Sequence, residues 1–328
     1  MSLEHQNNPP NIVNSKETGL SILDCINEKS RKYIIDVFEL IKREVGINKI
    51  LSIILFGSQR TNQECSTVSD CDLLIIFKNR VSNWHIREIE RYFLALEIKH
   101  DFKQLDSRIL KNILDVIEHS TGMFKSHFLT KQKFWEQCVF HKIFKVNRVF
   151  SAIFAPKNLV LGNVLQNSSL LYGKDIRKKI KPKIKISIYE IIKSTVMNLI
   201  ISIFATLISP FKYLNPIKYQ LEAIKWSLRA SNFYCFGDSE SLEKIISRFI
   251  SLESSKKQEK AKKFFLKFME LRNNPKTSIK FIKNCPIRIL KIHGKAIAYK
   301  KMIKRKEIKI PNEPPQTIYR NKFLSINY

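Results

Sequence analysis

Two apolar segments of strand length, each bordered by small or acidic residues, constrain the fold of this 328-residue chain most strongly. Residues 49–56 (KILSIILF) stop at Gly57-Ser58, and after a polar stretch the segment 70–77 begins with Asp70-Cys71-Asp72 and continues as LLIIF. Short apolar runs bounded by turn signals are typical of buried strands. Amphipathic helical patterns come before the first segment, from Asn27 to Gly46, and after the second, at 84–96. This alternation of helix and strand predicts an α/β domain.

The Gly-Ser pair and the two aspartates together predict a phosphate and metal site. Side chains alternate along a strand, so Asp70 and Asp72 point to one face and Cys71 to the other. Two neighbouring carboxylates need a compensating cation, and hard oxygen ligands suit Mg²⁺ that also bridges to phosphates. Backbone N–H groups at a Gly57-Ser58 turn attract phosphate, and the hydroxyl of Ser58 can donate a hydrogen bond. The plainer alternative, in which one aspartate caps a turn and the other faces solvent, stays open for either alone.

Phe56-Gly57-Ser58 and Ser69-Asp70-Cys71-Asp72-Leu73 resemble the signature of the DNA polymerase beta-like nucleotidyltransferase superfamily. The likeness is greatest to its minimal and kanamycin nucleotidyltransferase-like branch, and it covers residues 50–78 well and the layout up to 175 loosely. It implies an α/β (α+β) nucleotidyltransferase fold with a mixed sheet, followed by an α-helical bundle domain. It also implies an enzyme that transfers a nucleoside monophosphate from an NTP, with ATP the expected donor, to a hydroxyl acceptor. Mg²⁺, or Mn²⁺ in its place, is the implied cofactor.

The same resemblance implies roles for individual residues. Asp70 and Asp72 would be metal ligands and catalytic residues in a two-metal mechanism, which stabilises the attacking and leaving oxygens of an in-line displacement. Gly57 and Ser58 would hold the triphosphate. Arg60 is a further candidate for nucleotide binding, although an arginine on a solvated surface is equally consistent with its position.

A third carboxylate, acting as general base or second-metal ligand, is also part of the family pattern. Asp101, in the segment IKHDF, is the first candidate, with Glu97 and Asp106 behind it. A short strand near 97–102 would place it, but Glu97 could equally end a solvated helix, and geometry has to come before the assignment of a base. If all three fail, the site binds a nucleotide without turning it over.

A Lys- and Arg-rich stretch with Pro182, at 174–185, is the expected domain boundary. The predicted organisation is a disordered leader at 1–20, a nucleotidyltransferase domain at 21–180, an α-helical domain at 181–310 and a tail at 311–328. Helical patterns occur at about 187–209, 216–235, 239–253, 256–273 and 286–305. Within the last, Arg288 and His293 match the spacing of the Arg-x4-6-His motif of HEPN nucleases, a short pattern that arises readily by chance.

The charge balance favours polyanionic partners. The 58 Lys+Arg against 29 Asp+Glu give a net charge of +29, which suits nucleotides, RNA or an anionic membrane surface, although an AT-rich genome produces the same bias. The lysines between 256 and 267, with phenylalanines among them, predict a basic amphipathic helix that either solvates its lysines or binds RNA or membrane. Two rivals to the enzyme remain: a catalytically degenerate nucleotide- or RNA-binding protein, and an antitoxin-like protein-modifying nucleotidyltransferase. An RNA end, a protein side chain or a small hydroxyl or amino compound would each fit as the acceptor.

Cysteine use and hydropathy bear on location. The six cysteines are scattered without a C-x-x-C pair, which favours a reducing cytoplasm. Residues 194–211 (STVMNLIISIFATLISPF) carry no charge over nearly the length of a membrane span. Because Ser, Thr and Asn dilute the segment and Pro210 ends it, we expect a buried core helix and no stable membrane span.

Overall fold

The computed structural model describes residues 26–57, 71–102, 126–210 and 216–305, and the chain divides into two compact units, Met1–Glu190 and Ile191–Tyr328. The leader 1–20 and the tail 311–328 lie outside the described residues, and the domain boundaries stay predictions.

The first unit is built on a four-stranded mixed sheet with the order β3-β2-β1-β4. Its strands are β1 (Ile50–Phe56), β2 (Asp72–Phe77), β3 (His127–Lys131) and β4 (Ser168–Gly173). Strand β1 is antiparallel to both of its neighbours, while β2 and β3 are parallel. A parallel pair needs a crossover, and the described part of that crossover is helix α3 (Asn83–Lys99).

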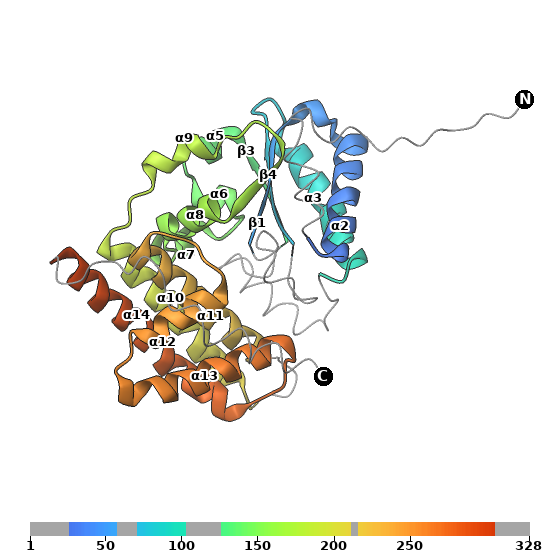
Figure 1. The fold of residues 1–328 in the computed structure, drawn as a ribbon. Helices are drawn as coiled ribbons and strands as arrows, with labels where there is room; N and C mark the ends of the chain where they lie inside the picture. Colours follow the sequence, from blue (N-terminus) through green and yellow to red (C-terminus); the bar gives the residue numbers. More distant parts are fainter. Residues whose placement is uncertain (1–25, 58–70, 103–125, 211–215, 306–328) are drawn as a thin grey trace, which may run out of the picture. The chain divides into compact units, whose positions relative to one another are not determined.

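Helices cover both faces of this sheet (Figure 1). On one face α2 (Glu28–Leu40) and α3 pack against a cluster that includes Leu55, Leu73 and Ile75. On the other face a second cluster joins Leu74 and Ile76 to the helical segments that follow β3. These segments are α5 (Gln132–Glu136), α6 (Phe140–Ile143), α7 (Arg148–Ile153), α8 (Lys157–Gln166) and α9 (Arg177–Ile180). Burial on both faces explains why the two central strands, β1 and β2, are nearly continuous apolar runs rather than alternating ones.

One local expectation in this unit is wrong. The segment 97–102 is not a strand, because α3 continues to Lys99 and the chain then turns through Asp101, whose φ of 51° lies in the left-handed region. The helix begins at Ser82, whose side chain accepts a hydrogen bond from the N–H of His85. It extends this far because Glu97, near its end, is buried and hydrogen-bonded rather than solvated. The sequence pattern of 97–102 fitted either a strand or the end of a helix, and the tertiary contact of Glu97 favours the helix.

The second unit is α-helical, as predicted. It contains α10 (Ile188–Ile208, whose first three residues fall in the first unit), α11 (Pro216–Phe236), α12 (Leu242–Ser251), α13 (Ser255–Asn273) and α14 (Ile279–Lys304). Helix α11 starts at a proline, whose fixed φ suits the first helical turn. Helix α14 starts at Ile279, seven residues before the expected start at Pro286, and continues through that proline. The fold class expected from the sequence, a mixed sheet with helices followed by a helical region, is confirmed.

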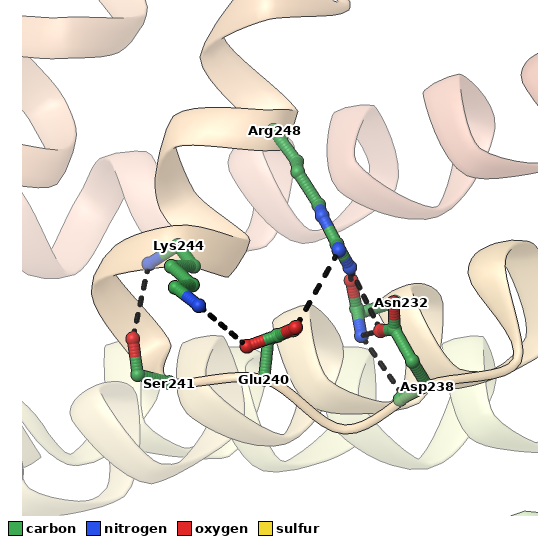
Figure 2. A network of polar contacts seen from close by, with 6 residues as sticks. All are labelled: Asn232, Asp238, Glu240, Ser241, Lys244 and Arg248. Atoms are coloured by element: carbon green, nitrogen blue, oxygen red, sulfur yellow. Dashed lines mark hydrogen bonds and ion pairs between the residues drawn. The ribbon is translucent and has the colours of Figure 1, made fainter. Parts of the chain in front are cut away.

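Two polar networks hold this helical unit together. The buried side chain of Gln220 on α11 donates to the carbonyl of Ser202 on α10 at 2.7 Å and to the carbonyl of Ile282 on α14 at 3.3 Å. The second network closes the turn between α11 and α12 (Figure 2), where Arg248 donates to Asn232 at 2.9 Å and to Asp238 at 2.7 Å. Its guanidinium also lies 4.8 Å from the ring centre of Phe236. These bonds fix which helix faces meet.

Helix α10 is the one described helix that is long and apolar enough to cross a membrane, with a mean hydropathy of 1.9. Only 44% of that apolar window is buried. The expectation of a buried core helix therefore holds for one face of α10 and not for the other.

Candidate functional site

The candidate site lies where β1 ends and β2 begins. Because the two strands are antiparallel, Phe56 pairs with Asp72, and Gly57 follows directly beside the Asp72 side chain. Gly57 has a φ of 82°, and a Cβ built on it would collide with the Asp72 carboxylate. Glycine is required here for two reasons: the left-handed backbone and the close approach of the carboxylate.

The alternation predicted for the aspartate strand agrees with the described residues. Cys71, Leu73 and Ile75 belong to the cluster under α2 and α3, whereas Leu74 and Ile76 belong to the cluster on the opposite face. Asp72 has the parity of Leu74 and is half-buried at the start of the strand. Ser58, Arg60 and Asp70 lie outside the described residues, so their roles stay predictions.

The neighbouring strand β3 offers no carboxylate beside Asp72 within its described length. Leu73 pairs with His127, which places Ser126 level with Asp72 and puts Phe128 and Thr130 on the same face. Ser126 also accepts a hydrogen bond from the N–H of Leu73 through its carbonyl, at 2.8 Å. Asp101, the first candidate for the third carboxylate, is exposed at the end of α3, the helix that covers the other face of the sheet. Its carbonyl accepts a hydrogen bond from Lys29 at 3.1 Å, and its catalytic role stays a prediction. Asp106 lies outside the described residues.

The family described as "Nucleotidyltransferase domain" matches residues 35–149, a range that contains β1, β2, β3 and the Gly57–Asp72 contact. The chain contains a nucleotidyltransferase domain. Among solved structures, the chain is similar to a spectinomycin adenyltransferase from Enterococcus faecialis determined with ATP and spectinomycin. The identity is 9%, the match covers 81% of this chain and 98% of that chain, and the TM-score is 0.48. No curated protein matches the chain.

A buried carboxylate in the nucleotidyltransferase domain was missed as a structural element. The side chain of Glu97, on α3, accepts from the N–H of Ser126 at 2.9 Å and lies 2.7 Å from Nδ1 of His127. The ring of His127 packs against Phe93, with ring centres 5.2 Å apart. The sequence signal was available, because Ile86, Ile89, Phe93 and Glu97 share one apolar helical stripe, where a carboxylate needs a partner.

The buried hydroxyl of Tyr33 belongs to the same region. Its pKa lies well above the usual value, first because of burial and next because of the negative charge of Glu97, followed by Cys71 and Asp72. We therefore expect the hydroxyl of Tyr33 to remain protonated near neutral pH.

The metal-binding expectation can be tested against these residues in part. Over the described ranges, no group of three or more His, Cys, Asp or Glu side chains could hold a metal ion. Asp72 nevertheless fits the role of one ligand of a metal–triphosphate complex, since its carboxylate stands against a glycine cradle that any side chain would fill. A complete site requires Asp70, which lies outside the described residues.

The HEPN-like spacing in α14 does not build a nuclease site. His293 is 1% exposed, and its Nδ1 lies 3.2 Å from the Tyr234 hydroxyl and 3.3 Å from that of Ser231. Burial lowers the pKa of His293 to about 4, so the ring is neutral near pH 7. The guanidinium of Arg288 packs over the ring of Phe264 at 4.7 Å. Both side chains therefore make packing and polar contacts within the helical unit.

The lysine-rich helix expected near 256–267 is present as α13. Phe265 and Phe268 are buried in the unit, while Lys256, Lys257 and Lys260 are exposed. This arrangement satisfies the simpler interpretation, in which the helix packs its aromatic face and solvates its lysines. Binding of RNA to its basic face stays a prediction.

Proposed function

We propose that this protein transfers a nucleoside monophosphate from a nucleoside triphosphate, with ATP as the expected donor, to a hydroxyl acceptor in the cytoplasm. The nucleotidyltransferase domain supports the class of reaction. The observation that carries the proposal within the chain is the contact of Gly57 with the Asp72 carboxylate at the adjoining ends of β1 and β2. The four described cysteines, all free thiols, are consistent with a reducing compartment.

In the proposed reaction, the acceptor oxygen forms a bond to the α-phosphorus, and the bond from that phosphorus to the bridging oxygen breaks. Pyrophosphate leaves, and the acceptor proton passes to a base. Asp72, together with Asp70, would hold Mg²⁺, which when bound supplies positive charge to the attacking and leaving oxygens. The backbone at Gly57 and the hydroxyl of Ser58 would orient the leaving phosphates.

A second candidate function is favoured by a specific observation. The described part of β3 places Ser126, Phe128 and Thr130, none of them acidic, on the face that carries Asp72. A domain with two metal ligands and no general base would bind a nucleotide without transferring it. The enzyme proposal needs a general base, for which Asp101 is the predicted residue, whereas the binding alternative needs none.

The test compares the full chain with Asp72→Asn and with a matched control, Glu136→Gln. Glu136 belongs to the same domain but follows the far end of β3, where it binds Lys179, so its loss leaves the candidate site intact. We expect labelled ATP and Mg²⁺ with a panel of RNA, protein and small hydroxyl acceptors to yield pyrophosphate with wild type and Glu136→Gln. Asp72→Asn should reduce the yield by about a hundredfold or more.

Binding of a non-hydrolysable ATP analogue, with and without Mg²⁺, separates the candidates. Mg²⁺-dependent binding that requires Asp72, without pyrophosphate release for any acceptor, would establish the binding function instead. Equal binding and equal turnover by wild type and Asp72→Asn would remove Asp72 from the site, and a wild type that neither binds nor turns over the nucleotide would eliminate both functions.

A further inference from the structure

Helix α10 exposes a stripe of apolar residues and buries several polar ones. Its exposed large side chains include Ile192 (51%), Val196 (38%), Ile200 (43%), Ile203 (44%) and Leu207 (67%). Their spacing of four, four, three and four residues places them on one stripe of the helix, roughly 22 Å long at 1.5 Å per residue. We call this set the α10 stripe.

The face of α10 that points inward carries polar groups beside the buried Ile201, Ala205 and Ile208. Ser194, Asn198 and Ser202 are each no more than 5% exposed. Ser202 donates its hydroxyl to Gln220 at 2.5 Å, and Gln220 donates back to the carbonyl of Ser202 and, at 3.0 Å, to the hydroxyl of Thr206. This inner face is therefore committed to the helical unit, and α10 cannot rotate to bury its stripe without breaking these bonds.

Such an arrangement is the reverse of an ordinary surface helix in water, which buries its apolar stripe. Contiguous apolar surface of this kind marks a site that contacts a membrane or another molecule. Polar side chains between helices and apolar side chains outward are the arrangement found where lipid is the surrounding medium. The exposed apolar residues of α14 do not form an uncharged stripe like that of α10. Ile287 and Leu290 are interspersed there with the exposed lysines Lys283 and Lys291.

The charge of the chain favours one occupant over the others. The stripe itself contains no charged residue, and the segment just before α10 in the sequence carries the exposed Lys181, Lys183 and Lys185. Basic residues next to an apolar helix face are the combination that binds bilayers with anionic lipids. A second copy is the less favourable occupant, because each chain has a net charge of +29 and like charges repel.

We propose that the α10 stripe is a peripheral docking surface for an anionic lipid bilayer. The helix lies along the bilayer surface with Ile200, Ile203 and Leu207 in the apolar layer, while the lysines before it contact phosphate groups. It does not span the bilayer, because its polar face remains hydrogen-bonded to α11. This surface is independent of the nucleotidyltransferase activity proposed above.

The test is co-sedimentation of the full chain with vesicles of phosphatidylcholine alone and of an equal mixture of phosphatidylcholine and phosphatidylserine. We compare wild type with the double variant Ile200→Ser/Ile203→Ser and with the matched control Ile287→Ser/Leu290→Ser, which changes two similarly exposed residues off the stripe. Lys181→Gln/Lys185→Gln tests the electrostatic part. Leu207→Ser, at the most exposed position of the stripe, repeats the test with a single change.

We expect wild type and the α14 control to bind the mixed vesicles, and binding to phosphatidylcholine alone to be several-fold weaker. The partition coefficient into mixed vesicles should fall about tenfold or more in the stripe variant. It should fall less in the lysine variant, and added salt should cause a similar decrease in wild type. Absence of wild-type binding to the mixed vesicles overturns the proposal, as does an equal loss in the stripe and control variants. A wild-type dimer in sedimentation equilibrium that Ile200→Ser/Ile203→Ser dissociates, without vesicle binding, would assign the stripe to a second copy.

Discussion

Three glycines with the same backbone conformation allow the candidate site to be tested by adding a single methyl group. Gly57, Gly173 and Gly237 have φ values of 82°, 82° and 74°. An alanine at any of them adopts the left-handed region at a cost of roughly 1–2 kcal/mol. The three positions share a positive φ and differ in what the new Cβ would meet, so comparison of the variants tests that contact.

At Gly237 the Cβ has nothing within 4 Å, so Gly237→Ala should lose only the backbone term, about 1 kcal/mol of unfolding free energy. At Gly173 the Cβ would collide with the carbonyl oxygen of Leu51, part of the backbone that pairs β4 with β1. Since a backbone atom cannot move aside, Gly173→Ala should lose roughly 3 kcal/mol. Urea denaturation of the full chain measures both values.

At Gly57 the obstacle is the carboxylate side chain of Asp72 rather than backbone. Gly57→Ala should therefore lose less unfolding free energy than Gly173→Ala, while displacement of the carboxylate causes the functional loss. A misplacement of about 1 Å costs on the order of a hundredfold in activity. Calorimetric titration with Mg²⁺ and a non-hydrolysable ATP analogue is the assay. Wild-type affinity in Gly57→Ala, or an equal loss in Gly237→Ala, would refute the assignment of this contact to nucleotide binding.

Other predictions concern buried polar groups. Glu97→Ala leaves the N–H of Ser126 and the ring of His127 without their acceptor and should cost about 3 kcal/mol in urea denaturation, whereas Glu97→Gln keeps an acceptor oxygen and should cost less than half of that. Arg248→Ala should cost about 2 kcal/mol by the same measurement and Arg248→Lys less; no measurable loss in Arg248→Ala would show that the forked contact to Asn232 and Asp238 is unimportant. For His293 the folded pKa of about 4 lies below the ordinary 6.5, so its contribution is full above pH 6.5 and decreases by up to about 3 kcal/mol as the pH falls to 4. Thermal melts across this range should show a shallower acid-side decline in His293→Gln than in wild type.

Strands β1 and β2 could be predicted from the sequence because they are short, mainly apolar and bounded by turn residues. Strand β2, for example, begins at Asp72 and ends at Phe77, within the predicted 70–77. Strands β3 and β4, HFLTK and SSLLYG, mix polar with apolar residues and carry no such signal. The helices of the second unit were also predictable, since each carries a long periodic pattern. Helix α14 was shortened in the prediction because Pro286 was taken as its start, whereas the preceding turns of the helix are formed and packed through Phe281 and Ile282.

The orientation of α10 could not be predicted for a physical reason. A segment such as 194–208 is so rich in apolar residues that both faces look suitable for a core, and its low amphipathicity gives no direction. The direction is decided by Gln220 on another helix, whose amide requires hydrogen-bonding partners in the interior. Ser202 supplies them, and the apolar side chains are turned outward as a consequence.

The same kind of contact links the candidate site to its support. Asp72 begins β2, the next residue, Leu73, donates its N–H to the carbonyl of Ser126, and the N–H of Ser126 is held by Glu97 from beneath the sheet. The carboxylate that the sequence offered as a reserve for catalysis therefore lies on the opposite face and positions the strand ends on which Asp72 stands. A structural role for Glu97 explains why an acidic residue is tolerated on an apolar helix stripe. Asp101 stays the predicted general base, because the described residues level with β2 on the Asp72 face, Ser126, Phe128 and Thr130, include no carboxylate.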